Sequence, residues 1–490
     1  MSEDSFSMKG YENFIEGKFV RGGNESQTIP VFNPSTEEEI AQVPESSEAE
    51  INRAIEAATR AQKKWAKLAA VERGKYLREI AAKIRDRTDF LARVITEEQG
   101  KPLGLAKVEV EFTAEYLVYM AEWARRIEGE ILTSDRSNEH IFLFRQPIGV
   151  VAGILPWNFP FFLIARKLAP ALVTGNTIVI KPSEETPINA FEFAKLVAET
   201  DLPPGVVNFV SGLGDTVGHK LTAHRGIGMV SFTGSVETGS KIMAAAAENI
   251  TKVNLELGGK APAIVLSDAN IDLAVEAIKN SRIINSGQVC NCAERVYVHR
   301  KIADEFTDRL ANAMKASRFG NPLKDLSVDY GPLINQEGVS KVESMVSRAK
   351  GEGASVVTGG RRADLGKGWF YEPTVLTDCR QEMEIVQKEI FGPVVPVVTV
   401  EDLDQAIEYA NDSEYGLTSS IYTSSIDVAM RACKEILFGE TYINRENFEA
   451  MQGFHAGWRK SGIGGADGKH GLYEYTQTHV VYIQFNSDVK

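Results

Sequence analysis

The chain has 490 residues, of which 43% are hydrophobic and 25% are charged, as is usual for a globular protein with two or three domains. It contains 54 Lys and Arg residues against 67 Asp and Glu residues. The resulting net charge of −13 argues against a nucleic-acid partner.

The first ten residues, MSEDSFSMKG, are polar and carry no apolar run of the kind found in secretion signals. The four cysteines, at positions 290, 292, 379 and 433, are too few and too scattered for a disulfide framework. They fit a reducing compartment, where a special cysteine is more often reactive than structural. We therefore expect a cytoplasmic protein.

The N-terminal region begins with short strand-like segments around the turn signal Asn33-Pro34-Ser35. From Ser47 the sequence SEAE forms a capping box, and the pattern stays helical to about Glu130. The next segment, EHIFLF (139–144), is an apolar strand candidate that lies outside the alternating series described below.

An uncharged run from Gln146 to Ala165 is long enough to suggest a membrane span. However, Pro156 and Pro160 each remove a backbone donor, and the amide of Asn158 would find no partner inside a bilayer. We therefore divide the run at the Pro-Trp-Asn-Phe-Pro turn, with a strand before it and a helix after it, and expect no membrane partner.

Five apolar strand candidates then alternate with helical stretches. The strands are expected at 149–155, 177–181, 206–210, 228–232 and 252–257, and the helices at 159–173, 187–200, 215–223 and 236–248. This alternation predicts a parallel sheet covered on both faces, with ligands beyond the carboxyl ends of its strands. Asn158 follows the first strand directly, so it lies where a site is expected.

A second alternating series from about Pro262 to about Asn444 predicts another α/β domain. The terminal segment THVVYIQF (478–485) is again an apolar strand candidate. This segment and 139–144 would be exposed liabilities unless they pair with each other or with another subunit. We interpret them as an oligomerisation arm, which predicts a homo-oligomer, a dimer or a tetramer.

Two cysteines stand close together in NSGQVCNC (285–292). A single cysteine is most often a small buried side chain, and the Cys-x-Cys spacing also permits a metal pair. No second cysteine pair exists and the seven histidines do not cluster in ligand spacing, so we expect no metal. Catalysis by cysteine would require a base and an oxyanion donor in the same crevice.

Seven motifs occur in the order of the aldehyde dehydrogenase superfamily: PWNFP (156–160), IVIKPSEETP (178–187), FTGSVETG (232–239), LELGGKAP (255–262), SGQVC (286–290), EIFGPV (389–394) and KSGIG (460–464). The chain resembles this family from about Phe14 to its C-terminus. The resemblance implies a Rossmann-type parallel-sheet cofactor domain (1–132 and 152–261), an α/β catalytic domain (262–462) and a small β oligomerisation arm (133–151 and 463–490).

The resemblance also implies catalytic roles for three residues. Cys290 resembles the family's nucleophile, Glu256 its general base and Asn158 the side-chain donor of its oxyanion hole. A thiolate that adds to an aldehyde forms an alkoxide that needs such donors, and the later thioester needs a base to activate water. The alternative for Glu256 is a helix cap or a surface charge, which fits poorly at the end of an apolar strand.

The cofactor implied by the resemblance is NAD. The positions that match the family's binding residues are Leu155, Lys181, Ser183, Glu184, Gly214, Gly234, Ser235, Lys341, Glu389 and Phe391. Glu184 is expected to accept from a ribose 2′-hydroxyl and so to favour NAD over NADP. Surface charge remains the alternative for Lys181 and Glu184. The stretch SGLGDTVG (211–218) imitates a dinucleotide motif with one residue too many.

The substrate side is expected to be polar, unlike an entrance for plain aliphatic aldehydes. The residues at the matching positions are Arg166, Asn291, Glu449 and His455. With Asn291, the stretch 448–465 resembles the branch of the family that oxidises lactaldehyde and glycolaldehyde.

Several alternatives remain open. The substrate could instead be another short aldehyde or a semialdehyde, the acyl acceptor could be CoA, and the protein could have kept the fold without activity. Arg166 could pair only with a carboxylate, and His455 could satisfy only a core hydrogen bond. Cys292 could form a disulfide with Cys290 or simply pack.

Overall fold

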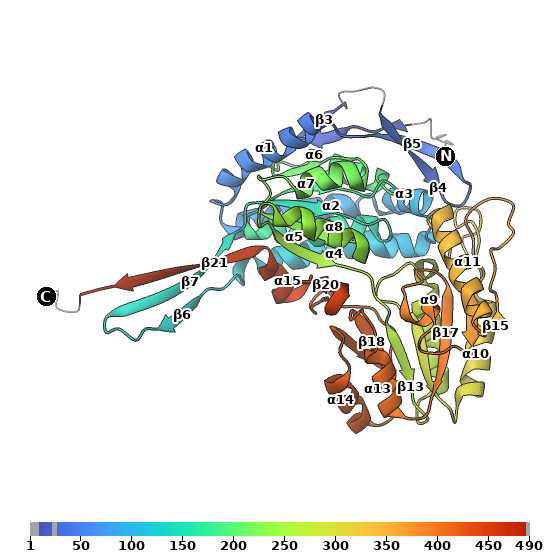
Figure 1. Cartoon of the computed structure of the whole chain (residues 1–490). Coiled ribbons are helices and arrows are strands. Elements are labelled where there is room, and N and C mark those ends of the chain that lie inside the picture. Colours follow the sequence, from blue (N-terminus) through green and yellow to red (C-terminus); the bar gives the residue numbers. More distant parts are fainter. Residues whose placement is uncertain (1–8, 22–26, 487–490) are drawn as a thin grey trace.

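The computed structural model describes residues 9–21 and 27–486. Most of the N-terminal decapeptide, in which we expect no secretion signal, lies outside the described residues. So do the start of the predicted cofactor domain (1–8) and the end of the predicted arm (487–490). Figure 1 shows two α/β layers, one above the other, and a slender β arm that projects to one side.

The first layer is built on an eight-stranded sheet in the order β20-β12-β11-β8-β9-β10-β2-β3. Its strands are β2 (Asn13–Ile15), β3 (Lys18–Val20), β8 (Val150–Ile154), β9 (Thr177–Lys181), β10 (Val207–Phe209), β11 (Met229–Thr233), β12 (Lys252–Glu256) and β20 (Gly462–Ile463). The five central strands are parallel to one another, as predicted. Antiparallel strands extend this sheet at both edges, β20 beside β12 and β2 with β3 beside β10, and the sequence did not predict this pairing.

Helices cover this sheet as expected. The crossover helices are α5 (Pro160–Thr174), α6 (Ile188–Ala198) and α8 (Val236–Ala247). The helix expected at 215–223 is also present: it begins as a π-helical turn, Gly214–Gly218, and continues as the single-turn α-helix α7 (His219–Thr222). The two glycines of the π-helical turn disfavour regular α-helical geometry there.

The N-terminal region forms a small sheet and a helical group. The sheet contains β1 (Lys9–Gly10), β4 (Thr28–Asn33) and β5 (Glu38–Pro44), and the helices are α1 (Glu48–Trp65), α2 (Ala70–Arg85), α3 (Thr88–Gln99) and α4 (Leu103–Glu122). The predicted capping box starts α1: Ser47 Oγ accepts from the Glu50 N–H, and Glu50 accepts from the Ser47 N–H at 2.8 Å.

The second layer is built on a seven-stranded sheet in the order β15-β16-β17-β14-β13-β18-β19, and only β15 is antiparallel. Its strands are β13 (Pro262–Val265), β14 (Arg295–His299), β15 (Ser355–Thr358), β16 (Thr374–Thr377), β17 (Val394–Val400), β18 (Thr418–Tyr422) and β19 (Glu440–Ile443). Its helices are α9 (Ile271–Ile283), α10 (Ala303–Ala316), α11 (Gln336–Gly351), α12 (Glu384–Gln387), α13 (Leu403–Asn411) and α14 (Ile426–Glu435). The predicted second α/β unit is therefore present.

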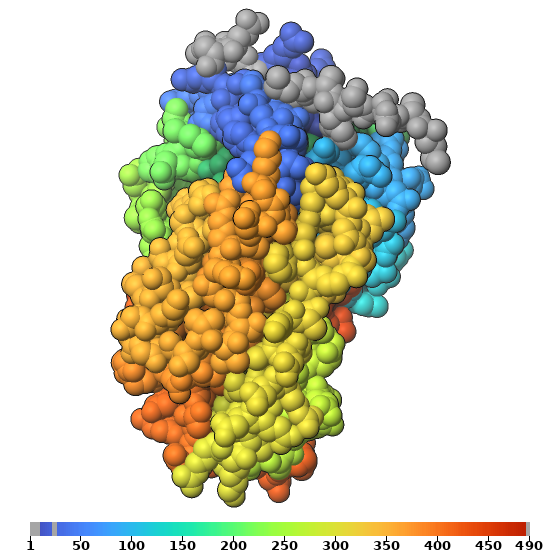
Figure 2. Space-filling view, turned by 90° about the vertical axis from the view of Figure 1, so that its right-hand side faces the viewer, coloured from blue at the N-terminus to red at the C-terminus, as the bar shows by residue number. Residues whose placement is uncertain are grey.

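The two layers also touch at the N-terminal sheet. Figure 2 shows the blue N-terminal part directly above the orange segment near residue 370. There the Trp369 N–H donates to the Pro34 carbonyl at 3.1 Å, and the Gly368 N–H donates to Glu37 Oε1 at 2.9 Å. These contacts help to fix how the layers face each other across the cavity described below.

The arm is a three-stranded sheet of β6 (Glu130–Thr133), β7 (Glu139–Pro147) and β21 (Thr476–Gln484). β21 pairs antiparallel with β7 from Thr476 opposite Pro147 to Gln484 opposite Glu139. The two strand candidates thus pair with each other, one of the two outcomes predicted. Large apolar side chains stay exposed on the arm, among them Ile131 at 71% and Tyr482 at 65%. Within the described part of the chain, no helix is both long and apolar enough to cross a membrane.

Candidate active site

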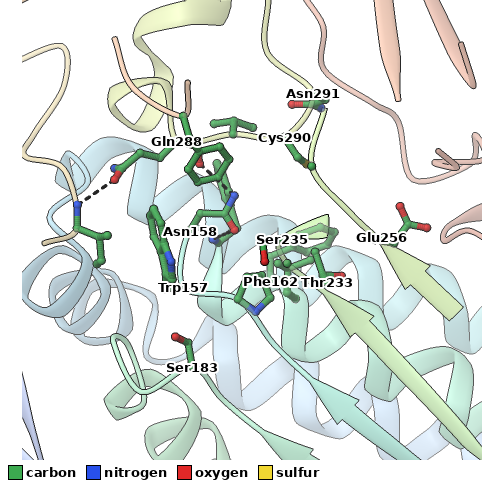
Figure 3. A pocket seen from close by; sticks show the side chains of 18 of the residues that line it. Trp157, Asn158, Phe162, Ser183, Thr233, Ser235, Glu256, Gln288, Cys290 and Asn291 are labelled. Atoms are coloured by element: carbon green, nitrogen blue, oxygen red, sulfur yellow. Dashed lines mark hydrogen bonds between the residues drawn. The ribbon is translucent and has the colours of Figure 1, made fainter. Parts of the chain in front are cut away.

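A cavity of about 710 Å³ lies between the two sheets, a size that suits a small-molecule or cofactor site. Its walls come from both layers: the ends of the parallel strands β8, β9, β11 and β12 on one side, and the cysteine loop, the start of α11 and the segment 389–391 on the other. Figure 3 shows the side chains of Asn158, Cys290 and Glu256 around this cavity, each from a different loop or strand end.

The amide of Asn158 is held against the cysteine loop. Asn158 Nδ2 donates to the Gln288 carbonyl at 3.0 Å, and its Oδ1 accepts from the Phe159 N–H at 3.0 Å. Its backbone carbonyl accepts from Lys101 Nζ at 2.8 Å. Since a side-chain amide carries two N–H donors and Gln288 takes one of them, Asn158 has a second donor to offer to a ligand.

The cysteine loop leaves α9 through three consecutive residues with left-handed backbone, Asn285 (φ 48°), Ser286 (φ 61°) and Gly287 (φ 75°). This conformation is strained for the first two, and hydrogen bonds hold it. Asn285 Nδ2 donates to the Asn158 carbonyl at 3.1 Å, and Ser286 Oγ donates to the Gly331 carbonyl at 2.8 Å. The loop is thereby fixed to both layers.

The two neighbouring cysteines differ sharply. Cys290 is half-buried and lines the cavity, whereas Cys292 is 1% exposed and does not line it. Cys292 Sγ accepts from Arg282 Nη1 at 3.0 Å, yet burial outweighs this cation and raises the pKa of the Cys292 thiol to about 12. Both cysteines are free, and Cys292 packs as a buried thiol, the second of its two predicted alternatives.

Glu256 ends β12 at the cavity wall, and the residue is 4% exposed. Within the described residues neither carboxylate oxygen has a hydrogen-bond partner. Burial raises the pKa of Glu256 to about 7, although His455, Arg166 and Lys167 oppose the shift. A buried carboxylate without partners at a cavity wall is neither a helix cap nor a surface charge, and its pKa suits a general base.

His455 lies next to Glu256. Its Nε2 is 3.7 Å from Glu256 Oε2, and its Nδ1 is 2.5 Å from Glu440 Oε1. Burial alone would lower the pKa of His455, but the carboxylates of Glu440 and Glu449 outweigh burial and raise it well above the usual value. His455 is therefore charged at neutral pH. It makes the buried hydrogen bond that was its alternative interpretation, and it also lines the cavity.

Three further predicted substrate residues form a connected polar group. Arg166 Nε donates to Asp467 Oδ1 at 3.1 Å, and a second guanidinium nitrogen pairs with the other Asp467 oxygen. Glu449 lies between Arg166, at 3.5 Å, and the side-chain amide of Asn291, which donates to it. Arg166 thus pairs with carboxylates, as its alternative interpretation held, and also lines the cavity.

The expected polar entrance is only part of what the structure shows. An aromatic wall of Phe112, Phe162 and Phe448 faces the polar group, with ring centroids 4.8 Å apart between Phe112 and Phe162 and 6.5 Å apart between Phe112 and Phe448. The guanidinium of Arg166 lies 5.5 Å from the centre of the Phe162 ring. This wall was not predicted, because all three of its members lie outside the seven family motifs.

Glu184 anchors the opposite end of the cavity, where a cofactor is expected. It accepts from Lys181 Nζ at 3.2 Å and from the Gly214 N–H at 3.3 Å. Burial would raise the pKa of Glu184, but Lys181 and the Gly214 N–H outweigh burial and lower it, so the carboxylate is charged at neutral pH. Such a carboxylate fits the hydroxyls of a ribose.

The first turn of α8 lies at the cavity, since Gly234, Ser235 and Thr238 line it. Ser235 caps the helix by accepting from the Thr238 N–H at 3.2 Å, and helix N-termini attract anions such as phosphate. A side chain at Gly234 would meet the Phe232 ring at 2.4 Å, so a larger residue there would force that ring to move. These features, with Glu184, fit a dinucleotide.

Glu389 also lines the cavity and accepts from the Gly259 N–H at 2.9 Å. Burial, supported by the charge of Glu294, raises the pKa of Glu389 to about 7. The ring of Phe391 stands edge-on to Trp157 with centroids 5.5 Å apart. Trp157 was not predicted, although it stands next to Asn158 in the PWNFP motif.

The cavity brings together most of the predicted site residues. Those that line it are Asn158, Arg166, Ser183, Glu184, Gly234, Ser235, Glu256, Cys290, Asn291, Lys341, Glu389, Phe391, Glu449 and His455. Leu155, Lys181 and Gly214 do not line it: Leu155 is buried with its N–H donating to the Lys181 carbonyl, while Lys181 and Gly214 bond Glu184.

Comparison with known proteins agrees with this geometry. A model of the aldehyde dehydrogenase family matches residues 20–481. Lactaldehyde dehydrogenase of Escherichia coli (strain K12) is 60% identical over 471 residues, which cover 96% of this chain and 98% of that protein. 3,6-Anhydro-alpha-L-galactose dehydrogenase of Vibrio sp. (strain EJY3) is 41% identical over 482 residues, 98% of this chain and 100% of that protein.

Solved structures give the same result. A crystal structure of lactaldehyde dehydrogenase from Escherichia coli matches with a TM-score of 0.96 and 60% identity over 97% of this chain and 99% of that one. Betaine aldehyde dehydrogenase from Staphylococcus aureus in complex with NAD⁺ matches with a TM-score of 0.94 and 37% identity over 98% of this chain and 96% of that one. The resemblance inferred from the seven motifs is confirmed, and the chain belongs to the aldehyde dehydrogenase family.

Proposed function

We propose that the protein oxidises a small 2-hydroxyaldehyde, such as lactaldehyde or glycolaldehyde, to its acid with NAD as the electron acceptor. The observation that carries this proposal is the polar group of Arg166, Glu449 and Asn291 in the cavity that Cys290 and Glu256 also line. The 60% identity to the lactaldehyde dehydrogenase of Escherichia coli supports it.

The chain's own residues supply the covalent chemistry. The Cys290 thiolate adds to the aldehyde carbon and forms a tetrahedral thiohemiacetal, whose oxyanion the Asn158 amide and the Cys290 N–H stabilise. Bound NAD would accept the hydride equivalent in the oxidation to a thioester. Glu184 would hold the adenosine ribose of this cofactor, the first turn of α8 its pyrophosphate, and Glu389 and Phe391 its nicotinamide ribose.

Glu256 carries the second half of the reaction. Its unpartnered carboxylate takes a proton from water, which attacks the Cys290 thioester and releases the acid. The charged His455, 3.7 Å away, stabilises the carboxylate form of Glu256. A base placed for water argues for hydrolysis rather than transfer to CoA, so NADH formation is expected without added CoA. The intact set of Cys290, Glu256 and Asn158 argues against a protein that kept only the fold.

The proposal includes the organisation of the chain and its assembly. Residues 1–132 and 152–261 form the cofactor domain, residues 262–462 the catalytic domain, and residues 133–151 and 463–490 the arm. The exposed apolar side chains of the arm support a homo-oligomer, since a monomer would leave them in water. A cytoplasmic location agrees with the free cysteines.

The substrate assignment is tested with a pair of aldehydes that differ by one hydroxyl. Lactaldehyde should exceed propionaldehyde in kcat/KM by about tenfold or more, because a site that bonds a hydroxyl strongly rejects the analogue without it. Glu449→Gln should shrink this ratio by acting mainly on lactaldehyde, since it weakens the link between Arg166 and Asn291.

Phe448→Leu is the matched control, because it alters the neighbouring wall without touching the polar group, and it should change kcat/KM for both aldehydes alike. A wild-type enzyme that oxidises propionaldehyde or succinate semialdehyde as well as lactaldehyde would refute the hydroxyaldehyde assignment.

Cofactor choice is tested at Glu184. Wild-type enzyme should prefer NAD to NADP, because the Glu184 carboxylate repels a 2′-phosphate. Glu184→Ser should lower the ratio of kcat/KM with NAD to kcat/KM with NADP by about tenfold or more, as expected for the loss of one like-charge contact. Glu45→Gln is the control, since Glu45 bonds the Leu213 N–H and Thr216 of the same loop but does not line the cavity. Better kinetics of the wild type with NADP than with NAD would contradict the proposal.

A further inference from the structure

Three charged side chains form a buried cluster behind the cavity: Lys260, Arg282 and Glu294, each at most 1% exposed. The Glu294 carboxylate has four donors. Its Oε2 accepts from Lys260 Nζ at 2.8 Å and from the Ile390 N–H at 2.9 Å. Its Oε1 accepts from Arg282 Nη1 at 2.7 Å and from the Phe391 N–H at 3.1 Å. One carboxylate therefore holds two cations and two consecutive backbone N–H groups.

Arg282 connects this carboxylate to the cysteine loop. Its Nε donates to the Gly392 carbonyl at 2.8 Å, while its other nitrogens reach the Ala293 carbonyl at 3.1 Å and the Gly287 carbonyl at 3.3 Å. The two loops also touch directly, since a side chain at Gly287 would lie 2.3 Å from the Gly392 carbonyl oxygen. Arg282 is thus bonded to the loop on each side of Cys290 and to the segment that contains Phe391.

Lys260 brings in the segment that follows the base strand β12. Its neighbour Gly259 donates its N–H to Glu389 Oε1 at 2.9 Å, and a side chain at Gly259 would lie 2.7 Å from the Cys290 carbonyl oxygen. Three functional segments therefore meet at the cluster: 258–260 after the base, 287–294 around the nucleophile, and 389–392 beside the cofactor part of the cavity.

The cluster fixes a backbone conformation that Phe391 does not favour. Phe391 has left-handed backbone with φ 58°, which costs energy in a bulky residue unless surrounding contacts impose it. The hydrogen bond from its N–H to Glu294 is such a contact. Burial would raise the pKa of Glu294, but Arg282 and Lys260 outweigh burial and lower it, so Glu294 accepts these bonds as a charged carboxylate.

From these contacts we infer that Glu294 is a positioning residue for the cofactor: it sets the backbone of Ile390 and Phe391 so that the Phe391 ring and the Glu389 carboxylate take up the nicotinamide ribose. This inference rests on the proposed function, in which Glu389 and Phe391 hold that part of NAD. Glu294 itself does not line the cavity, so its action is indirect.

The alternative is a buried ion cluster that stabilises the fold and has no specific effect on the cofactor. A double-mutant cycle separates the two roles, with the dissociation constant of NADH measured by fluorescence titration without aldehyde. Glu294→Gln should weaken NADH binding by about tenfold or more, because the amide nitrogen faces donors and the charge is lost. In a Glu389→Gln background the same change should weaken binding by no more than about twofold.

Glu98→Gln is the matched control. Glu98 is also a fully buried glutamate that accepts from two consecutive N–H groups, those of Ile188 and Asn189, and it does not line the cavity. Burial raises the pKa of Glu98 to about 8, so this variant controls for the loss of a buried hydrogen-bond acceptor rather than of a charge. This variant should lower the thermal unfolding midpoint and leave NADH binding within about twofold of wild type.

A conservative variant guards against simple misfolding. Glu294→Asp keeps the charge but is one methylene shorter, so it cannot reach all four donors, and we expect a lowered thermal unfolding midpoint, a protein still folded at the assay temperature, and weakened NADH binding. The inference would be overturned if Glu294→Gln weakened NADH binding equally with and without Glu389→Gln. It would also be overturned if NADH binding were unchanged in both Glu294 variants. A wild type that binds NADH and shows the expected cycle, yet forms no NADH from any aldehyde, would instead refute the proposed function.

Discussion

Replacing Cys290 with serine is expected to reduce NADH formation from aldehyde by about 10⁴-fold or more, the scale on which catalytic nucleophiles act. A hydroxyl is a far weaker nucleophile than a thiolate at neutral pH, and Cys290 is the cysteine that lines the cavity. The assay is NADH absorbance with lactaldehyde, after thermal unfolding has shown that the variant is folded.

Cys292→Ser is the matched control for this experiment. Cys292 is buried beside Arg282, and a serine hydroxyl can still accept from that guanidinium, so most of the activity should remain. An inactive Cys292→Ser together with an active Cys290→Ser would show that the nucleophile had been misplaced by two residues.

The second large effect is expected at Glu256. Glu256→Gln should leave a rapid burst of NADH, one per active site, and slow the following steady state by about 10²–10⁴-fold. Formation of the thioester precedes the step that needs the base, so removal of the base lets the thioester accumulate. Rapid mixing followed by steady-state recording separates the two phases, and an equal loss of burst and steady state would contradict the assigned role.

The same residue predicts a pH dependence. The carboxylate form of Glu256 accepts the proton, and its pKa is raised to about 7, so the steady-state rate of the wild type should rise as the pH increases through about 7. In Glu256→Gln this inflection should disappear, because no titrating group remains at that position. Retention of the inflection in the variant would assign it to another group.

Much of the fold and of the site could be predicted from local sequence patterns. The five parallel strands were readable because each is a short apolar run with a polar or glycine-rich segment directly after it, and Asn158 and Glu256 were recognisable as polar groups at such strand ends. The capping box of α1 was equally local. These features depend on residues that are near one another in the chain.

What could not be predicted depends on contacts between distant segments. Asp467 and Glu440 fix Arg166 and His455, but nothing in their own sequence surroundings marks them as partners of residues on α5 and in the loop 448–455. The aromatic wall joins α4, α5 and Phe448 in the same way. The cluster at Glu294 also brings together three separate segments, so only the folded chain reveals it.

The short strand β20 has a consequence for the synthesis of the protein. It pairs antiparallel with β12, with Gly462 opposite Glu256, so the edge of the first sheet next to the base is completed by residues made about two hundred positions later. At ribosomal rates of roughly 5–20 residues per second, the nascent chain exposes an open β edge for roughly 10–40 seconds. During that interval the strand that carries Glu256 is a template for pairing with the wrong segment. Even after its first half has folded, the chain therefore depends on Gly462–Ile463 to close that edge, and chaperones are expected to matter most at this stage of its biogenesis.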